Sequence, residues 1–342
     1  MTITPIKPSG IVLFTTLRCT AACENCCNGC SPKQGRTMTL DEMKSYVDMS
    51  LKAYPDTIST LDLTGGECML LGKDVERIMS YAKGKGLKSM MVSNAFWATS
   101  YDKAYTTLKR LKRCGLTKVS FSTGEDHNRF VPWMNVRNAS VAAARWGIDT
   151  ELRIELQYGR MSIAHELEKD EDIIGLKNQG RLKFSISPWM SYSKNVGVRN
   201  RKIKYIDSGK KDSCQHLFQN IIINPYGEVY ACCGIGACHI PQMRLGNVYH
   251  EPVKAIYERA FEDFMKIWLF VDGPEAVLRY VHEKTGQKFP CYTTHLCDIC
   301  RTIFRDKTIL PLIAENFYDA AYIPLISYNA IAKSNNESRA KR

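Results

Sequence analysis

The sequence predicts an α/β protein, because short apolar runs alternate with stretches of helical periodicity along its N-terminal part. Units of roughly 30 residues with this alternation are typical of a parallel sheet joined by crossover helices. An incomplete barrel and a doubly wound sheet both fit the pattern. In either architecture the reactive residues lie in the loops that follow the strands.

The strand and helix assignments follow from period and length. The predicted strands are 11–16, 60–63, 89–93, 118–122, 151–157 and 183–187. The predicted helices between them are 40–52, 73–83, 102–114, 135–146 and 164–177. Six strands before residue 195 therefore define the N-terminal part of the fold.

The pattern changes after a charged segment at 193–211. Runs at 221–223 and 228–232 flank Asn224-Pro225-Tyr226-Gly227, a turn sequence that predicts a hairpin. Helices are predicted at 252–269 and 274–285, followed by a cysteine-rich loop, and the polar last ten residues are expected to be a frayed tail. We place a boundary near residue 205, which gives domains at 1–205 and 206–342.

Composition narrows the functional classes. The chain has 342 residues and a formal net charge of +12, but its basic residues form no stripe interleaved with aromatics, so a nucleic-acid partner is not favoured. No apolar run approaches the ~18 residues that a membrane-spanning helix needs. The first ten residues lack the features of a secretory signal. These observations predict a cytoplasmic protein without a membrane partner.

Fourteen cysteines fall into two groups, which in a chain without an export signal favours metal ligation over disulfides. Cys19, Cys23 and Cys26 form a CxxxCxxC loop directly after the first predicted strand. Three thiolates suit an iron–sulfur cluster with one iron left open, whereas a structural zinc site would recruit Cys27 or Cys30 as a fourth ligand.

The second group combines Cys214 and Cys232, spaced C-x12-G-x4-C across the predicted hairpin, with the CxxC pair Cys297 and Cys300. Four such thiolates make a closed set that fits zinc as well as a [4Fe–4S] cluster. The spacing alone leaves both open.

Gly65-Gly66-Glu67 follows the second predicted strand, and together with CxxxCxxC it resembles the radical SAM superfamily over residues 11 to about 195. The resemblance implies a partial (β/α)6 TIM-like barrel in which Cys19, Cys23 and Cys26 hold a [4Fe–4S] cluster. S-adenosyl-L-methionine (SAM) would chelate the open iron, with its amine cradled by Gly65, Gly66 and Glu67. Further implied cofactor contacts are Ser93, Asn94, Ser122, Thr123 and Arg153. Asn25 departs from the aromatic residue that often precedes the third cysteine.

The second cysteine group resembles the SPASM extension of these enzymes, in the shortened form called twitch, because no cysteine follows Cys300. The resemblance implies one auxiliary [4Fe–4S] cluster held by Cys214, Cys232, Cys297 and Cys300. A further thiol near the substrate could donate a hydrogen atom, as in radical SAM epimerases. The candidates are Cys238 and Cys291.

The resemblance implies an oxidoreductase or isomerase that reductively cleaves SAM to a 5′-deoxyadenosyl radical and abstracts a substrate hydrogen atom. An external flavodoxin- or ferredoxin-like protein would donate the electron. We favour a ribosomally made peptide (RiPP) as substrate, changed by epimerisation, dehydrogenation or cross-linking. The region before the first strand leaves no room for a leader-binding domain, so a partner protein would supply one. The alternatives are an aminocyclitol or sugar dehydrogenase or epimerase, and a zinc-stapled, non-catalytic binding protein.

Overall fold

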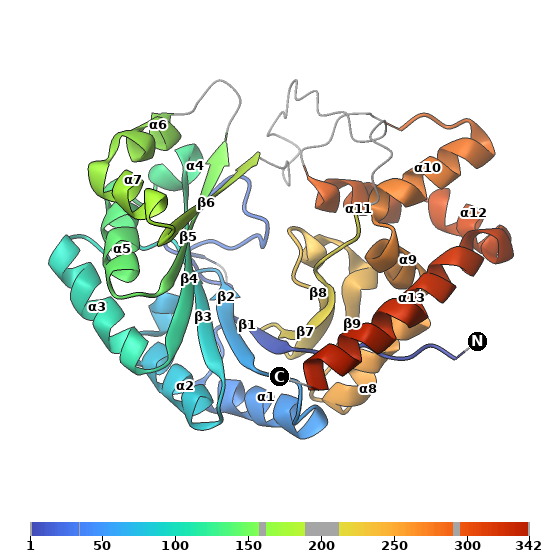
Figure 1. Cartoon of the computed structure of the whole chain (residues 1–342), viewed down its shortest axis with the longest axis horizontal. Coiled ribbons are helices and arrows are strands. Elements are labelled where there is room, and N and C mark those ends of the chain that lie inside the picture. Colours follow the sequence, from blue (N-terminus) through green and yellow to red (C-terminus); the bar gives the residue numbers. More distant parts are fainter. Residues whose placement is uncertain (1, 34, 157–161, 189–211, 290–294, 341–342) are drawn as a thin grey trace.

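The structure is a computed structural model, which describes residues 2–33, 35–156, 162–188, 212–289 and 295–340 (Figure 1). Six parallel strands pair in the order in which they occur along the chain. They are β1 (Gly10–Thr16), β2 (Thr60–Gly65), β3 (Lys88–Ser93), β4 (Leu116–Gly124), β5 (Asp149–Leu156) and β6 (Leu182–Pro188). Each predicted strand is therefore confirmed, with ends that differ by a few residues at most.

Helices cover the outer face of these strands, so the architecture is the incomplete barrel rather than a doubly wound sheet (Figure 1). They are α1 (Leu40–Ala53), α2 (Lys73–Gly84), α3 (Tyr101–Arg113), α4 (Glu125–Asn128), α5 (Trp133–Arg145), α6 (Ser162–Lys169) and α7 (Glu171–Asn178). A short 3-10 helix, η1 (Cys68–Leu71), follows β2. The predicted helix 164–177 is divided because the Asp170 side chain caps the N–H of Ile173 and starts α7.

Local signals explain where the helices begin. Thr39 and Glu42 form a capping box at the start of α1, each side chain bonded to the other's backbone N–H. The apolar side of α1, with Met43 and Val47 buried, packs in one core with Leu61 and Leu63 of β2. The barrel wall is thus a continuous apolar layer, which leaves the strand ends to carry polar groups.

The C-terminal part continues the same sheet. β7 (Leu217–Ile223) pairs parallel with β1, and β8 (Glu228–Cys232) and β9 (Arg244–Asn247) extend it antiparallel, giving a nine-stranded sheet. The predicted hairpin is confirmed, and Gly227 adopts φ 74° in its turn. The proposed boundary near residue 205 lies outside the described residues.

Helices pack around this extension on the side opposite α3 and α5 (Figure 1). They are α8 (Val253–Glu258), η4 (Arg259–Glu262), α9 (Phe264–Val271), α10 (Pro274–Thr285), α11 (Leu296–Arg305), α12 (Ile309–Glu315) and α13 (Phe317–Ala340). Two 3-10 turns, η2 (Ala237–His239) and η3 (Pro241–Met243), link β8 to β9. Asp263 caps Met265 and divides the predicted helix 252–269.

The prediction of a frayed C-terminal tail is wrong for the described residues, because α13 continues through Ala340. Its side chains bind the N-terminal segment: the Tyr328 hydroxyl donates to the Thr4 carbonyl at 2.9 Å. The Asn336 side chain accepts from the Lys7 N–H and donates to the Pro5 carbonyl, each at 2.9 Å. Hydrogen bonds between the two ends of the chain, which sequence periodicity does not reveal, hold this helix in place. No described helix has the length and apolar character needed to cross a membrane.

Candidate active site

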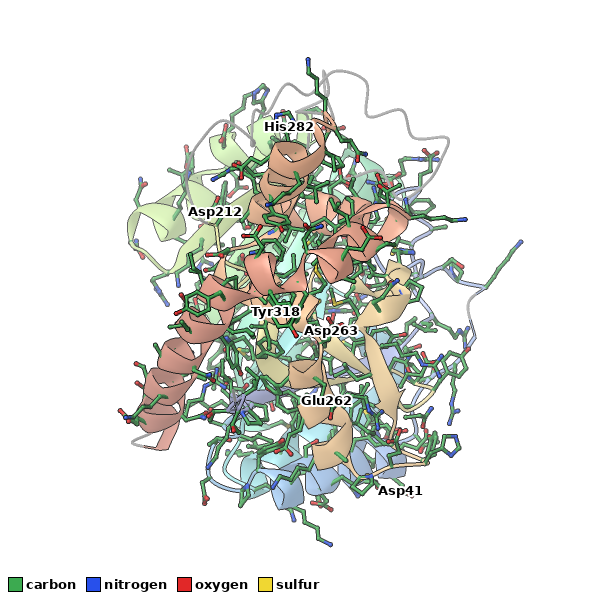
Figure 2. All side chains as sticks on the ribbon, turned by 90° about the vertical axis from the view of Figure 1, so that its right-hand side faces the viewer. Asp41, Asp212, Glu262, Asp263, His282 and Tyr318 are labelled. Atoms are coloured by element: carbon green, nitrogen blue, oxygen red, sulfur yellow. The ribbon has the colours of Figure 1, made fainter. Side chains whose placement is uncertain are left out.

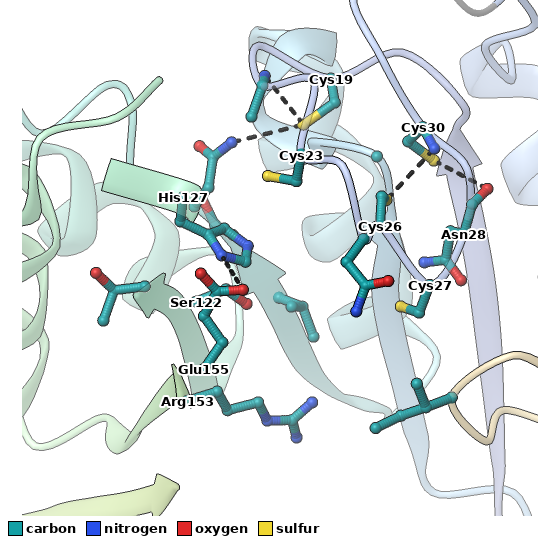
Figure 3. A pocket seen from close by; sticks show the side chains of 18 of the residues that line it. Cys19, Cys23, Cys26, Cys27, Asn28, Cys30, Ser122, His127, Arg153 and Glu155 are labelled. Atoms are coloured by element: carbon teal, nitrogen blue, oxygen red, sulfur yellow. Dashed lines mark hydrogen bonds and ion pairs between the residues drawn. The ribbon is translucent and has the colours of Figure 1, made fainter. Parts of the chain in front are cut away.

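A cavity of about 290 Å³ lies at the carboxyl ends of the barrel strands (Figure 3). The loop after β1 contributes Cys19, Cys23 and Cys26, and the ends of the other strands complete the lining. Polar contacts from neighbouring strands hold the loop. The Glu24 N–H donates to the buried Asp126 carboxylate at 2.8 Å, and the Asn94 amide donates to the Thr20 hydroxyl at 3.0 Å.

The three thiols differ in their pKa. Burial raises the pKa of Cys19 to about 11, and burial together with the Asp126 carboxylate raises the pKa of Cys23. The pKa of Cys26 is instead lowered to about 6, because the Cys30 thiol and backbone N–H donate to its sulfur. Two buried thiols thus need a nearby positive centre to ionise, which is what metal ligation supplies.

The cysteines surround a space rather than a point. In the part of the chain that the structure describes, no three His, Cys, Asp or Glu side chains come close enough together to coordinate a single ion. A polynuclear cluster keeps its thiolate ligands further apart than one zinc ion does. Cys19, Cys23 and Cys26 line this cavity, and their thiols are donors that fit an iron–sulfur cluster.

The Gly65-Gly66 pair lets the end of β2 lie directly against the cysteine loop. Gly65 has φ 128°, and a Cβ on it would lie 2.4 Å from the Thr16 carbonyl oxygen. A Cβ on Gly66 would lie 2.0 Å from the Arg18 carbonyl oxygen. The Gly66 N–H donates to Thr16 at 2.7 Å, so the two backbones are hydrogen-bonded as well as close. Only glycine permits this approach.

Glu67 does not reach the cavity, in contrast to the direct cofactor contact predicted for it. Its side chain is fully buried and accepts from the Ser93 hydroxyl at 2.9 Å, the Asn94 N–H at 2.7 Å and the Met69 N–H at 3.0 Å. Burial raises its pKa to about 7. The carboxylate thus fixes the end of β3, where Ser93 and Asn94 line the cavity.

The other predicted contacts come together as expected from their strand ends. The structure places around one cavity Gly65, Gly66, Ser93, Asn94, Ser122, Thr123 and Arg153. The Thr123 hydroxyl is buried and has no hydrogen-bond partner among the described residues. Such an orphaned polar atom at a cavity wall is available to a bound group.

One pair in the lining is not among the predicted site residues, although the position of His127 after a strand suggests a contact there. His127 at α4 and Glu155 at the end of β5 lie with Nδ1 and Oε2 3.6 Å apart (Figure 3). Burial alone would lower the pKa of His127, but the Glu155 carboxylate outweighs it and the pKa is raised. In its protonated form His127 lowers the pKa of the nearby Cys26 thiol. Position after a strand was the only sequence signal for either residue.

The four cysteines predicted for the auxiliary site line a second cavity of about 160 Å³. The β7–β8 hairpin brings Cys214 near Cys232, and Cys297 and Cys300 share one side of α11 because they are three residues apart. Burial raises the pKa of every one of them. The four predicted cysteines thus share one cavity, and their thiols have the same need for positive charge in order to ionise. Ile235 lines both this cavity and the first one.

Of the two candidate hydrogen-atom donors, the structure describes Cys238. Cys238 is exposed, donates its S–H to the Cys27 carbonyl at 3.2 Å, and is absent from the described lining of the first cavity. Cys291 lies outside the described residues. Cys233 is not in that described lining either; its sulfur lies 4.0 Å from His216, and the charges of Asp62 and Arg153, both on barrel strands, act on it. Arg153 itself lines the first cavity.

Asp62 of β2 should make the protein less stable as the pH rises from about 4 to about 7. Burial raises its pKa to about 7, whereas an unperturbed aspartate has a pKa of about 3.9. The folded state therefore binds this proton more tightly than the unfolded state does. The resulting stabilisation is complete below the pKa of the unfolded state, and it is lost as the pH rises through the pKa of the folded state. Asp62→Asn should flatten the melting temperature against pH over this window, and exposed Asp56→Asn should leave it unchanged. A profile that keeps its slope in Asp62→Asn would contradict this assignment.

Comparison with known proteins agrees with this geometry. Residues 214–275 match the SPASM family, an iron–sulfur cluster-binding domain. The putative peptide biosynthesis protein YydG of Bacillus subtilis (strain 168) is 23% identical over 292 residues, which cover 84% of this chain and 89% of YydG. The solved structure of native anSMEcpe with bound AdoMet superposes with a TM-score of 0.55 at 14% identity, covering 96% of this chain and 100% of that one. The structure of BtrN with AdoMet and 2-DOIA gives a TM-score of 0.46 at 14% identity, covering 79% and 89%.

The structure thus has a cysteine-lined cavity at the barrel and a second one in the part of the chain that includes the iron–sulfur cluster-binding domain. The chain therefore carries a SPASM iron–sulfur cluster-binding domain at residues 214–275, and its fold is that of the solved anSMEcpe structure. The family match covers Cys214 and Cys232 and ends before Cys297, so the hairpin half of the auxiliary site is the part that the family defines.

Proposed function

We propose that this enzyme modifies a ribosomally made peptide after abstracting one of its hydrogen atoms. The observation that carries the proposal is the likeness to YydG, a putative peptide biosynthesis protein, over most of both chains. The electron would come from a flavodoxin- or ferredoxin-like donor, and a partner protein would present the leader of the peptide. We propose S-adenosyl-L-methionine as the cofactor at the first cavity.

Each part of the first cavity has a role in this proposal. The thiolates of Cys19, Cys23 and Cys26 would hold three irons of a [4Fe–4S] cluster, because they form the CxxxCxxC loop and all three line the cavity with the strand ends. When bound, the cluster and SAM supply one-electron cleavage of a C–S bond and a species that removes hydrogen from carbon. The Gly65-Gly66 backbone keeps the cofactor space close to the cysteine loop.

The polar strand ends would orient the cofactor. The Thr123 hydroxyl, which lacks a partner among the described residues, can bind a polar group there, and Ser122 lies beside it. Arg153 offers a guanidinium for a carboxylate, while its other contact is to Glu151 at 3.1 Å. Walls of this kind exclude water and hold the reacting carbon, which is the main contribution of the protein to cofactor chemistry.

The position between the two cavities suits a substrate. Ile235 contributes to both linings, so a peptide segment at this point would lie between the cofactor space and the auxiliary site. There the auxiliary cluster held by Cys214, Cys232, Cys297 and Cys300 can exchange electrons with a substrate radical or brace the hairpin. We favour the first of these roles because the two cavities share a wall.

Turnover of a candidate precursor peptide in deuterated water tests the proposed function. The reduced enzyme with SAM should form 5′-deoxyadenosine and change the peptide. Solvent deuterium in an otherwise isomeric peptide indicates epimerisation, and loss of two hydrogen atoms indicates dehydrogenation or cross-linking. An enzyme that leaves every peptide from its own gene neighbourhood unchanged but oxidises an aminocyclitol would overturn the peptide assignment.

If the reaction is an epimerisation, Cys233 is the thiol that we expect to donate hydrogen to the substrate carbon. This expectation rests on the charge of Arg153, which lines the first cavity and acts on Cys233. Cys233→Ser should still release 5′-deoxyadenosine but form no epimerised product. The matched variant Cys238→Ser should turn over normally, because that thiol is exposed and bonded to Cys27. Normal product formation by Cys233→Ser would remove the role.

A further inference from the structure

The C-terminal helix α13 carries an apolar surface that nothing in the described structure covers. Tyr318 is 92% exposed, Tyr322 70%, Ile323 63% and Ile326 44%. Figure 2 views the molecule from this side and labels Tyr318 at the start of the helix. Contiguous exposed apolar groups of this size mark interaction sites in soluble proteins.

Three exposed residues of α13 are spaced seven residues apart. Seven residues make almost two helical turns, so Asp319, Ile326 and Lys333 lie on one side of α13. Tyr322 and Ala330, also exposed, lie beside that line. The opposite side is buried against the protein through Ala321, Tyr328 and Ala332, as Figure 1 shows for the helix as a whole. We call the outer side, from Asp319 to Lys333, the α13 stripe.

The α13 stripe is complementary to the same stripe of a second copy that runs in the opposite direction. Between Asp319 and Lys333 the sequence has no charged residue, so the stripe is acidic at one end, apolar in the middle and basic at the other. Both charges are seven residues from Ile326. Two helices that cross at Ile326 in opposite directions would place Asp319 of each opposite Lys333 of the other. Parallel pairing would put like charges together, which is destabilising.

The side-chain sizes also match when the two helices run in opposite directions. Tyr322 and Ala330 are each four residues from Ile326, so the large tyrosine of one helix would lie opposite the small alanine of the other. Large side chains that pack over small ones are the usual way in which facing helices interdigitate. The Asp319 carboxylate is 60% exposed although Lys284 binds it at 2.6 Å, so it remains accessible to a second cation.

We propose that two copies of this chain associate through the α13 stripe, antiparallel about a two-fold axis at Ile326. Such an interface is isologous: the same patch serves both copies, and each contact occurs twice. The catalytic cavities take no part in it, so the proposal is independent of the substrate. A second copy is favoured over an unrelated partner because charge and size both match under the two-fold operation.

Light scattering of the full-length, cluster-loaded protein across a concentration series tests the proposal. The native chain should be dimeric, and Tyr322→Glu/Ile326→Glu should raise the dissociation constant at least about 100-fold, because it buries unpaired carboxylates at the centre of the interface. The matched control is Met49→Glu, since Met49 is 40% exposed on α1, away from the stripe. That variant should remain dimeric, and thermal melts should show that all variants fold.

A charge-swap experiment tests the antiparallel geometry. Asp319→Lys and Lys333→Glu should each weaken self-association, because two like-charged pairs then face each other in the homodimer. Mixed together, the two variants should form a heterodimer in which both pairs are again opposite in charge. A native chain that is monomeric throughout, including one that instead binds anionic or neutral vesicles, overturns the proposal. A dimer that none of these substitutions weakens overturns it as well.

Discussion

The Cys19→Ala/Cys23→Ala/Cys26→Ala variant should release no 5′-deoxyadenosine and should keep about half of the iron. Reconstitution of the native protein should give about eight irons, because two cubanes of four irons each are expected. The triple change removes the three proposed ligands of the first cavity and leaves the four of the second in place. Iron and labile-sulfide assays, together with chromatography of the nucleoside product, measure both effects.

Cys114→Ala is the matched control for this variant. Cys114 caps the far end of α3 and lines neither cavity in the described structure, so its removal should change neither iron content nor product. One tightly bound zinc without labile sulfide in the native protein would contradict the cluster assignment. Iron lost completely in the triple variant would mean that the two sites do not load independently.

The second large effect is expected from Gly66→Ala. A Cβ at this position would lie 2.0 Å from the Arg18 carbonyl oxygen, a backbone atom that cannot move aside without moving the cysteine loop. Moving the cysteine loop away from the end of β2 would also break two backbone hydrogen bonds. The Gly66 N–H donates to the Thr16 carbonyl at 2.7 Å, and the Glu67 N–H donates to the Arg18 carbonyl at 2.9 Å. We expect loss of iron from the first site and at least a 100-fold loss of 5′-deoxyadenosine formation, on the order of 3 kcal/mol.

Gly84→Ala separates this local effect from a general cost of replacing glycine. Gly84 ends α2, and a Cβ there meets no atom within 4 Å. Alanine is the better helix former, so this variant should keep full iron and activity, with a melting temperature equal to or above that of the native protein. Full cluster occupancy in Gly66→Ala would show that the loop adapts to the clash.

The barrel could be predicted from sequence because each strand is a short apolar run followed by a distinct helical pattern. The grouping of the cysteines at two cavities could be predicted because CxxxCxxC and the hairpin cysteines depend on local spacing, which a strand or a turn preserves. The Gly65-Gly66 pair belongs to the same class, since a close backbone approach requires glycine wherever it occurs. Such signals depend on residues that are close in sequence, so they can be recognised before the tertiary structure is known.

Other features depend on contacts distant in sequence. Glu67 follows the glycines as predicted, but its side chain turns into the core, where three donors from η1 and the end of β3 bind it. His127 and Glu155 meet only because β4 and β5 are neighbours. The order of α13 depends on hydrogen bonds to residues near Thr4 and Lys7, at the opposite end of the chain. No periodicity in the sequence encodes these pairings.

The parallel pairing of β1 with β7 has a consequence for biosynthesis. β1 lies between β2 and β7, so it needs partners from both halves of the chain. While the ribosome is still translating the segment before residue 217, one edge of β1 has no strand to bind. The nascent barrel therefore exposes unpaired backbone next to the cysteine loop during that interval, a state prone to aggregation. Chaperone protection and late iron delivery, after the hairpin has been made, would suit such a chain.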